Sequence, residues 1–422
     1  MSNASQAWKL SMHINKGKAG AVVSVSHDGE KTTVNKIPLV NAESSEREQV
    51  FIGLAADGAA IQMDANSQAI KHDETFLAES YVPYAYPHYD GDTHWYSYDG
   101  DKESGEDRQA CPNGGAPMLV VRNNGESAEV VKMVCLGRGH HVVAFSAPTA
   151  TNTAIPKYAF VSNLLDGNIV VLGNDPADAE HYLQVIKIID LCEADKEKSG
   201  EHCTPNNAFP HGMAFSPLTG KVYSLNNGYA SIVVIDPLSL EIESRLQMKK
   251  SSNLLLSHDG RYLIGKGADR KTDPEHVMGC ISIVDVMSGN TEASLDLPDI
   301  YPSTYRFNRD GSKLYVTTAA TGKGTQRENI KMDLLQVYDT SALPEIKLVK
   351  EVKVGVADCG RRPLAYIASN DGPDRLFIPN PTDGTLTVLD GASDEVLETI
   401  DIDDGDANEI SFSFWDGEVF GS

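Results

Sequence analysis

The chain has 422 residues, a formal net charge of −24 at pH 7 and a hydrophobic content of 41%. This hydrophobic content suffices for a large core, and no run approaches the ~18 consecutive apolar residues that a membrane-spanning helix needs. The negative charge argues against nucleic acid and against anionic membrane surfaces as partners.

The first residues, MSNASQAWKLSMHINKGK, contain no apolar segment flanked by positive charge, so the sequence predicts no signal peptide. Two locations stay open on this basis. The protein is periplasmic or secreted if a signal segment was removed, and cytoplasmic otherwise.

Residues 7–40 have the pattern of three strands, and Asp28–Gly29 marks the turn before the third. They lack the opening strand that precedes such a set elsewhere in the chain. Residues 409–422, EISFSFWDGEVFGS, resemble the beginning of a repeat that then stops. We therefore predict that the two ends of the chain pair in one composite blade, because this arrangement removes exposed sheet edges.

Residues 50–63 begin another repeat, which a long segment at about 64–116 then interrupts. This segment is rich in Tyr, Asp and Gly and has no sustained period. Loops of this length in a compact fold are usually functional or disordered, and the aromatic residues argue against disorder. We predict an ordered insertion that covers one end of the ring.

The insertion carries two histidines and several acidic residues, and these allow two interpretations. The histidines could complete a metal site, or the carboxylates could bind calcium through hard oxygen ligands. Alternatively, the segment is a solvated acidic loop. The residues concerned are His88, His94, Asp90, Asp92, Asp99 and Asp101.

A repeat of four short strands recurs from residue 139 onwards. Its clearest copy covers residues 209–248, with the strands HGMAFS, KVYSLN, SIVVID and EIESRLQ. Asp-Gly pairs mark the turns of several copies, and these residues tolerate the positive φ of tight hairpins. A four-stranded sheet cannot bury both faces alone and must stack on its copies. Counting the composite blade, the sequence predicts an all-β, seven-bladed β-propeller that forms a single domain over residues 1–422.

The six cysteines fall into three kinds. Two of them bracket a short polar loop, which is typical of a local disulfide and of an oxidising compartment. Two others flank a predicted strand and could also meet, and the last two lie in repeats and are expected as buried thiols. In this order the pairs are Cys192 with Cys203, Cys111 with Cys135, and Cys280 with Cys359.

In a propeller the first strand of each blade lines the central channel. The starts of these strands place His140 and His141 of one blade, and His211 of the next, at one end of the channel. Clustered imidazoles suit copper, zinc or iron. Because side chains alternate along a strand, His140 and His141 should not both be ligands. In the alternative interpretation, these histidines are hydrogen-bonded residues that close the channel mouth.

The pair Arg361–Arg362 lies near the same channel mouth. A guanidinium group is suited to holding a carboxylate or another anion. Pairing with one of the many acidic residues of the protein explains the two arginines equally well.

The motifs GHHVVAFS and FPHGMAFSPLTGKVYS resemble strand starts of the nitrous oxide reductase propeller, and KLYVTT resembles the YVTN propellers. The propellers of thiocyanate dehydrogenase and of the haem-binding nitrite reductase are similar. This resemblance implies a redox function with copper or haem. However, the positions that match further histidine ligands hold other residues, so a complete copper cluster is not expected. These residues are Ser252, Ser303, Leu364 and Asn408.

Three functions are compatible with the sequence, since the fold does not decide among them. The first is a metal-dependent, copper-type redox enzyme or redox-enzyme subunit with its site at the channel end. The second is a non-catalytic scaffold that binds a protein partner. The third is a lactone hydrolase with a divalent ion held by Asn253, Asn408 and Glu409. In each case the expected partner is a protein or a small-molecule ligand at the channel end.

Overall fold

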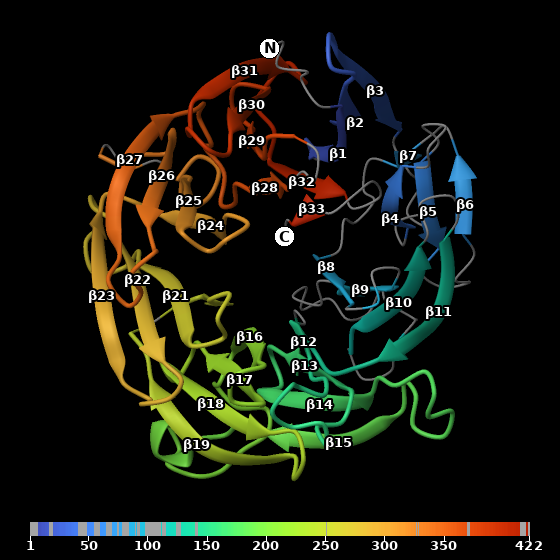
Figure 1. Cartoon of the computed structure of the whole chain (residues 1–422), viewed down its shortest axis with the longest axis vertical. Helices are drawn as coiled ribbons and strands as arrows, with labels where there is room; N and C mark the ends of the chain where they lie inside the picture. The colour runs from blue at the N-terminus through green and yellow to red at the C-terminus, as the bar shows by residue number, and fades with distance from the viewer. Residues whose placement is uncertain are drawn as a thin grey trace.

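The computed structural model is a ring of antiparallel sheets around a central channel (Figure 1). Among the described residues, no helix has the length and apolar character needed to cross a bilayer. The structure describes residues 7–16, 20–40, 49–54, 60–64, 70–73, 76–77, 84–88, 90, 93–97, 111, 115–123, 128–139, 142–249, 251–325, 327, 329–368, 372–413 and 419–420.

Six of the sheets are formed by strands that follow one another along the chain. The first three are β8 (Tyr84–Pro87), β9 (Thr93–Ser97), β10 (Pro117–Asn123) and β11 (Ala128–Cys135); β12 (Val143–Phe145), β13 (Tyr158–Asn163), β14 (Asn168–Gly173) and β15 (Val185–Asp190); and β16 (Pro210–Ser216), β17 (Lys221–Asn226), β18 (Ser231–Asp236) and β19 (Glu241–Gln247). The next three are β20 (Asn253–Leu256), β21 (Tyr262–Asp269), β22 (Met278–Asp285) and β23 (Thr291–Pro298); β24 (Pro302–Phe307), β25 (Lys313–Thr318), β26 (Leu334–Asp339) and β27 (Lys347–Lys353); and β28 (Ala365–Ile367), β29 (Arg375–Asn380), β30 (Thr385–Asp390) and β31 (Val396–Asp401), joined by β33 (Val419–Phe420).

The seventh blade combines both ends of the chain. It contains β32 (Glu409–Ser413), β1 (Trp8–Asn15), β2 (Gly20–His27), β3 (Thr32–Val40) and β7 (Phe76–Leu77), in this order. These seven sheets of four or five strands confirm the predicted all-β, seven-bladed propeller. A smaller three-stranded sheet lies in the ring between β3 and β11 and consists of β4 (Gln49–Leu54), β5 (Ala60–Asp64) and β6 (Ile70–Asp73) (Figure 1).

The described part of the predicted insertion at about 64–116 forms strands. β8 and β9 pair with each other, and β9 pairs with β10, so this part of the chain belongs to a blade. That the segment also covers one end of the ring stays a prediction, because much of it lies outside the described residues.

Within each blade the strands differ in burial as a stacked sheet requires. The strands β12, β16, β20, β24 and β28 lie nearest the channel, and β15, β19, β23, β27 and β31 lie at the perimeter (Figure 1). The middle strand β17 is almost entirely buried, whereas β19 is exposed along most of its length. Apolar side chains of one sheet pack on those of the next, as Phe160 and Val171 do with Val222 and Val233. Burial on both faces explains why the middle strands are continuous apolar runs.

Glycines with positive φ lie at the hairpin turns that the sequence predicts. Gly220, Gly260 and Gly311 have φ values of 68°, 74° and 75°. This left-handed conformation is strained for other residues, so glycine is required at these turns.

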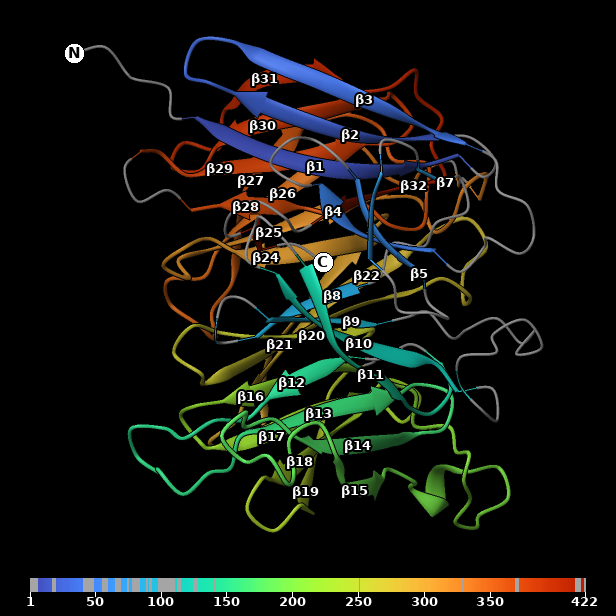
Figure 2. The ribbon, with the colours of Figure 1, turned by 90° about the vertical axis from the view of Figure 1, so that its right-hand side faces the viewer.

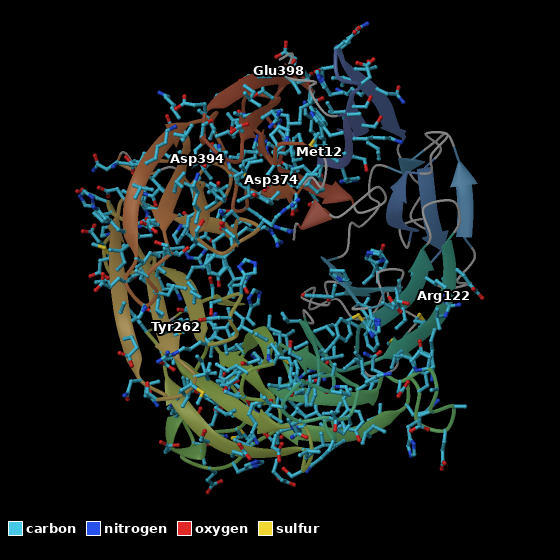
Figure 3. The ribbon with its side chains drawn as sticks, in the orientation of Figure 1. Met12, Arg122, Tyr262, Asp374, Asp394 and Glu398 are labelled. Carbon is cyan, nitrogen blue, oxygen red and sulfur yellow. A yellow bond between two sulfur atoms is a disulfide. The ribbon has the colours of Figure 1, made fainter. Side chains whose placement is uncertain are left out.

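The ring closes through β1 and β32, which pair from Ser11↔Ser413 to Asn15↔Glu409. Figure 2 shows β1, β2 and β3 beside the β28–β31 blade. On β1, Met12 is fully buried and belongs to a core cluster with Phe377 and Ile410 (Figure 3). The predicted closure by strands from the two ends of the chain is therefore confirmed for residues 11–15 and 409–413, whereas residues 419–420 pair with β28 of the neighbouring blade.

Polar contacts reinforce this closure. Lys16 and Lys36 both form ion pairs with the carboxylate of Asp403, whose side chain is almost fully buried. Thr32 Oγ1 donates a hydrogen bond to Glu398 Oε2 at 2.9 Å, which links β3 to β31. A similar contact joins neighbouring blades elsewhere, where the hydroxyl of Tyr315 donates to Asp394 at 2.8 Å.

Cys111 and Cys135 form a disulfide with a Cα–Cα distance of 5.4 Å. Cys192 and Cys203 are thiols, so the predicted bridge between them is wrong. The backbone N–H of Cys203 instead donates to Cys192 Sγ at 3.4 Å. The remaining two cysteines, Cys280 and Cys359, are buried thiols as predicted.

Truncating a side chain of the closing strand should destabilise the whole ring. We expect Ile410→Ala to lower the free energy of unfolding by about 2–5 kcal/mol, because Ile410 is fully buried and its loss leaves a cavity. Val349→Ala on β27 is the control, since Val349 is 52% exposed and its change should stay within about 0.5 kcal/mol. Chemical unfolding measures both values, and equal small effects would contradict the importance of this closure.

The closing strand β1 should also make stability depend on pH. Burial lowers the pKa of His13 from 6.5 to about 4. Below pH 6.5 this histidine is therefore protonated in the unfolded chain, whereas in the folded chain it becomes protonated only near pH 4. The contribution of His13 to the free energy of unfolding is therefore greatest above pH 6.5. It decreases as the pH drops towards 4, by up to about 1.4 kcal/mol per pH unit.

Replacing His13 by Asn should flatten this part of the profile. Urea unfolding of wild type and His13→Asn at pH 7, 6 and 5 isolates the contribution of one group, since all other titrating groups are shared. Parallel profiles for the two proteins would show that His13 does not cause the loss.

Candidate central cavity

A cavity of about 470 Å³ opens at the channel, where the inner strands β16, β20 and β24 converge (Figure 1). Its wall is built by consecutive blades, each of which contributes residues from its inner strand or from the segment before it. The polar and charged residues that line the cavity include His211, Asn253, Lys266, Ser303, Arg306 and Arg361.

Three cationic side chains line this cavity. Lys266 lies on β21, Arg306 on β24 and Arg361 just before β28. Burial, followed by the nearby charge of Arg361, lowers the pKa of Lys266 to about 8. The same two causes lower the pKa of Arg306 to about 10. The charge of Arg361 thus disfavours the charged forms of Lys266 and Arg306, inside a protein whose net charge is −24.

The contacts of Lys266 leave its charge without a counter-ion among the described residues. Its Nζ donates a hydrogen bond to the carbonyl of Pro302 at 3.2 Å and lies 5.6 Å from the ring centroid of Tyr305. The Tyr305 hydroxyl donates to the carbonyl of Ile264 at 2.7 Å, and burial raises the pKa of this phenol. Tyr305 therefore stays neutral and offers Lys266 only the face of its ring.

His211 is the predicted histidine that the structure places at the cavity. Its Nδ1 lies 2.5 Å from the carbonyl oxygen of Ser252. Because a carbonyl only accepts hydrogen bonds, Nδ1 carries a proton in this contact. The next residue, Gly212, has to be small, because a Cβ at this position would lie 2.7 Å from the backbone nitrogen of Leu254 on β20.

The other channel histidines of the prediction, His140 and His141, lie outside the described residues. Their approach to His211, and with it a metal site at this end of the channel, stays a prediction.

His88 is buried at the contact between the β8–β11 and β12–β15 blades, where both of its ring nitrogens have partners. Nε2 lies 2.9 Å from Asn174 Nδ2, and Nδ1 lies 3.0 Å from Asp90 Oδ2. Burial lowers the pKa of His88, although Asp90 opposes this. His94 is partly buried on β9, with its ring 6.1 Å from that of Tyr96.

The two arginines of the predicted anion site have different surroundings. Arg361 lines the cavity, and its Nη1 donates to Glu409 Oε1 at 3.2 Å. Arg362 is fully buried, and its Nη2 donates to the carbonyls of Met332 and Gly355. Only the first of the pair therefore lines the cavity, whereas the second holds loop backbone in place.

Lys266 and Arg306 were missed by the sequence reasoning. The signal for Lys266 was a charged residue within the mainly apolar strand YLIGKGAD, whereas Arg306 lies in the mixed segment STYRF and gave no such signal. Buried positive charges of this kind are rare unless they are paired or functional.

The acidic insertion is only partly described. Asp90 accepts hydrogen bonds from the backbone and the hydroxyl of Thr93, both at 2.8 Å, which is a local turn. Asp92, Asp99 and Asp101 lie outside the described residues, so the predicted calcium site stays a prediction.

A separate group could hold a metal ion. Within the described ranges, the one set of three or more His, Cys, Asp or Glu residues with ligand atoms within 4.8 Å of one another is Cys192, Glu197 and Cys203. It contains none of the predicted histidines and lies in the loop between β15 and β16.

Comparisons with known proteins agree with this architecture. The periplasmic gluconolactonase PpgL of Pseudomonas aeruginosa is similar with a TM-score of 0.56 and 13% identity, over 97% of this chain and 100% of that one. A protein from Lactobacillus plantarum has a TM-score of 0.52 and 13% identity, over 96% and 99% of the two chains. Hydrazine synthase of Kuenenia stuttgartiensis has a TM-score of 0.46 and 15% identity, over 72% and 93%. No protein-family model matches the chain, and no curated protein matches its sequence. At these identities the likeness concerns the fold alone.

Proposed function

We propose that this protein binds a small organic anion in the central cavity, with Lys266, Arg306 and Arg361 as its charge partners. The observation that carries the proposal is the convergence of these three cations on one cavity in an acidic protein. Buried charges are costly unless they are paired. A bound anion would supply a charge partner for Lys266, which has no counter-ion among the described residues, and would thereby stabilise the cavity.

The chemistry of the wall narrows the ligand class. Arg306 and Arg361 offer planar, multiple donors that match carboxylate or phosphate groups. The carboxylate of Glu409 already offsets part of the charge of Arg361. The contacts of Lys266 include no carboxylate among the described residues, which favours a ligand that carries at least one negative charge. A cavity of about 470 Å³ fits a small molecule.

A metal-dependent redox function, with copper or another transition metal at the channel end, draws its support from the position of His211 on the cavity wall. The same wall weakens that proposal, because a metal cation there would lie among three positive side chains. A pure scaffold function would leave the cation cluster without a role. Electrostatics therefore favours the anion over either alternative.

Lactone hydrolysis is the second candidate function, and the cation cluster favours it too. Water attack on the ring carbonyl forms an oxyanion, and opening of the ring leaves a hydroxy-carboxylate, which the arginines can hold. Nε2 of His211 is suited to accept the proton of the attacking water. The fold of a gluconolactonase is similar.

The residues expected to hold a divalent ion for this reaction have other partners. Glu409 pairs with Arg361, and Asn408 Oδ1 accepts a hydrogen bond from Lys323 at 3.0 Å. Asn253 lines the cavity, and its Oδ1 accepts the N–H of Leu254 at 2.7 Å. The described contacts thus support a hydrolysis assisted by cationic side chains more than one assisted by a divalent ion.

The location that we propose is the periplasm or the cell exterior. The disulfide between Cys111 and Cys135 requires an oxidising compartment to persist. The similar gluconolactonase is a periplasmic protein.

Anion binding can be measured by calorimetric titration with gluconate, succinate and inorganic phosphate. We expect Lys266→Met and Arg361→Gln to weaken binding of the preferred anion at least about tenfold, since each removes a partly buried charge partner. Glu409→Gln should strengthen binding, because it removes a carboxylate that competes for Arg361. Affinity should fall as the pH rises through about 8, where Lys266 loses its proton.

The matched control is Arg309→Gln, which removes a positive charge from the same β24–β25 hairpin but outside the cavity lining. It should leave the affinity unchanged. Lys266→Met should also raise the unfolding temperature of the empty protein, because a buried ammonium group destabilises it. Absence of binding by all three anions, or equal losses in the control, would contradict the proposal.

Hydrolysis is tested separately with glucono-1,5-lactone in a pH-stat. The wild type should release acid faster than the spontaneous reaction, and His211→Gln should lower kcat while calorimetry shows unchanged gluconate binding. If gluconate binds but the lactone is opened only at the spontaneous rate, the protein is a binding protein and the hydrolase candidate is wrong.

A further inference from the structure

We propose that Cys192, Glu197 and Cys203 form a zinc site in the loop between β15 and β16. This site is separate from the central cavity and does not depend on the function proposed there. The two sulfurs and a carboxylate oxygen lie within 4.8 Å of one another. Glu197 is buried, with 9% of its surface exposed, and both cysteines are partly buried.

One carboxylate brings the two cysteines together. Asp190, the last residue of β15, accepts hydrogen bonds from the backbone N–H of Cys192 at 2.8 Å and from the hydroxyl of Thr204 at 2.8 Å. It also accepts from the side chain of Asn206 at 3.1 Å. The loop is thereby fixed next to each cysteine, so the two sulfurs are held close before any ion arrives.

Glu197 is oriented by its own set of donors. Its Oε1 accepts hydrogen bonds from the backbone N–H of Asn207 at 2.8 Å and from the hydroxyl of the buried Tyr229. Its Oε2 accepts from Asn207 Nδ2 at 2.6 Å. Carboxylates that ligate metals are typically held in this way by outer hydrogen bonds.

The charge of Glu197 has no cationic partner among the described residues. Lys196, its neighbour in the chain, pairs instead with Glu193 at 2.7 Å and donates to the carbonyl of Tyr229 at 3.0 Å. If the two cysteines formed a disulfide instead, the buried carboxylate of Glu197 would lie beside an uncharged group and would still have no cationic partner among the described residues. A divalent cation accounts for all three groups together.

The donor set selects zinc. Zinc binds thiolate sulfur at about 2.3 Å and carboxylate oxygen at about 2.0–2.2 Å in tetrahedral sites, which spaces the ligand atoms by roughly 3.5–4 Å. Calcium and magnesium take oxygen ligands, and copper(I) prefers sulfur without a carboxylate. Binding would release the two thiol protons, and three protein ligands leave the fourth position to water.

The site can be tested by metal analysis of the full chain, purified without chelator and equilibrated with zinc. We expect one zinc per chain in the wild type. Competition with a chromophoric chelator should show that Cys192→Ser and Cys203→Ser lower the zinc affinity at least about a hundredfold, and Glu197→Gln at least about tenfold. The matched control is Glu193→Gln, which removes a carboxylate from the same loop and should keep the zinc.

A second measurement uses only the wild type, so it holds even where a variant misfolds. Zinc should slow the labelling of Cys192 and Cys203 by iodoacetamide relative to the metal-free chain. Labelling of the buried Cys280 and Cys359 should not change. The proposal is overturned by a Cys192–Cys203 disulfide in the purified protein, by unchanged zinc content in the cysteine variants, or by equal labelling with and without zinc.

Discussion

The pairing of β1 with β32 is the constraint on which the rest of this structure depends. A blade buries its faces only against two neighbours, so a ring with one missing contact would expose two apolar faces and two sheet edges. Here the contact is made by strands from opposite ends of the chain, between Ser11↔Ser413 and Asn15↔Glu409. Asp403 strengthens it by pairing with lysines that precede and follow β2. The other described blades are formed by consecutive or nearby segments of the chain.

The central cavity, in contrast to this closure, lowers the stability of the folded protein. Closure buries apolar surface and pairs its charges, whereas Lys266 is buried and Arg306 half-buried, and desolvation lowers the pKa of both side chains. Sites that bind ligands are often destabilising in the empty state, and the surrounding structure must compensate. The large interblade cores supply this compensation, because each middle strand is buried on both faces.

The architecture was largely predictable because it repeats. Turn glycines such as Gly220 and apolar strands such as KLYVTT carry a local signal that recurs along the chain. The beginning of a repeat at residues 50–63 corresponds to β4 and β5, whereas β6, β8 and β9 fell in the predicted insertion because they follow the repeat less closely. The sequence favoured a bridge between Cys192 and Cys203 and left one between Cys111 and Cys135 open, since proximity in sequence does not say how the sulfurs are directed.

The site was predictable only in part, because it is assembled across blades. His211 and Arg361 stood at strand starts that the repeat alignment places on the channel, and both line the cavity. Lys266 lies well inside β21, where alternation alone does not reveal that its side chain reaches the cavity. A charge within an apolar strand is a signal of function, but it does not say which space the charge reaches.

Glu409 connects the closing strand with the cavity. It occupies the first position of β32, opposite Asn15, and its carboxylate contacts Arg361. In the sequence it follows Lys266, Arg306 and Arg361, the three residues that bring positive charge to the cavity. The carboxylate of Glu409 therefore stands beside Arg361 only when β32 is paired with β1, so one side chain couples the closure of the ring to the charge balance of the cavity.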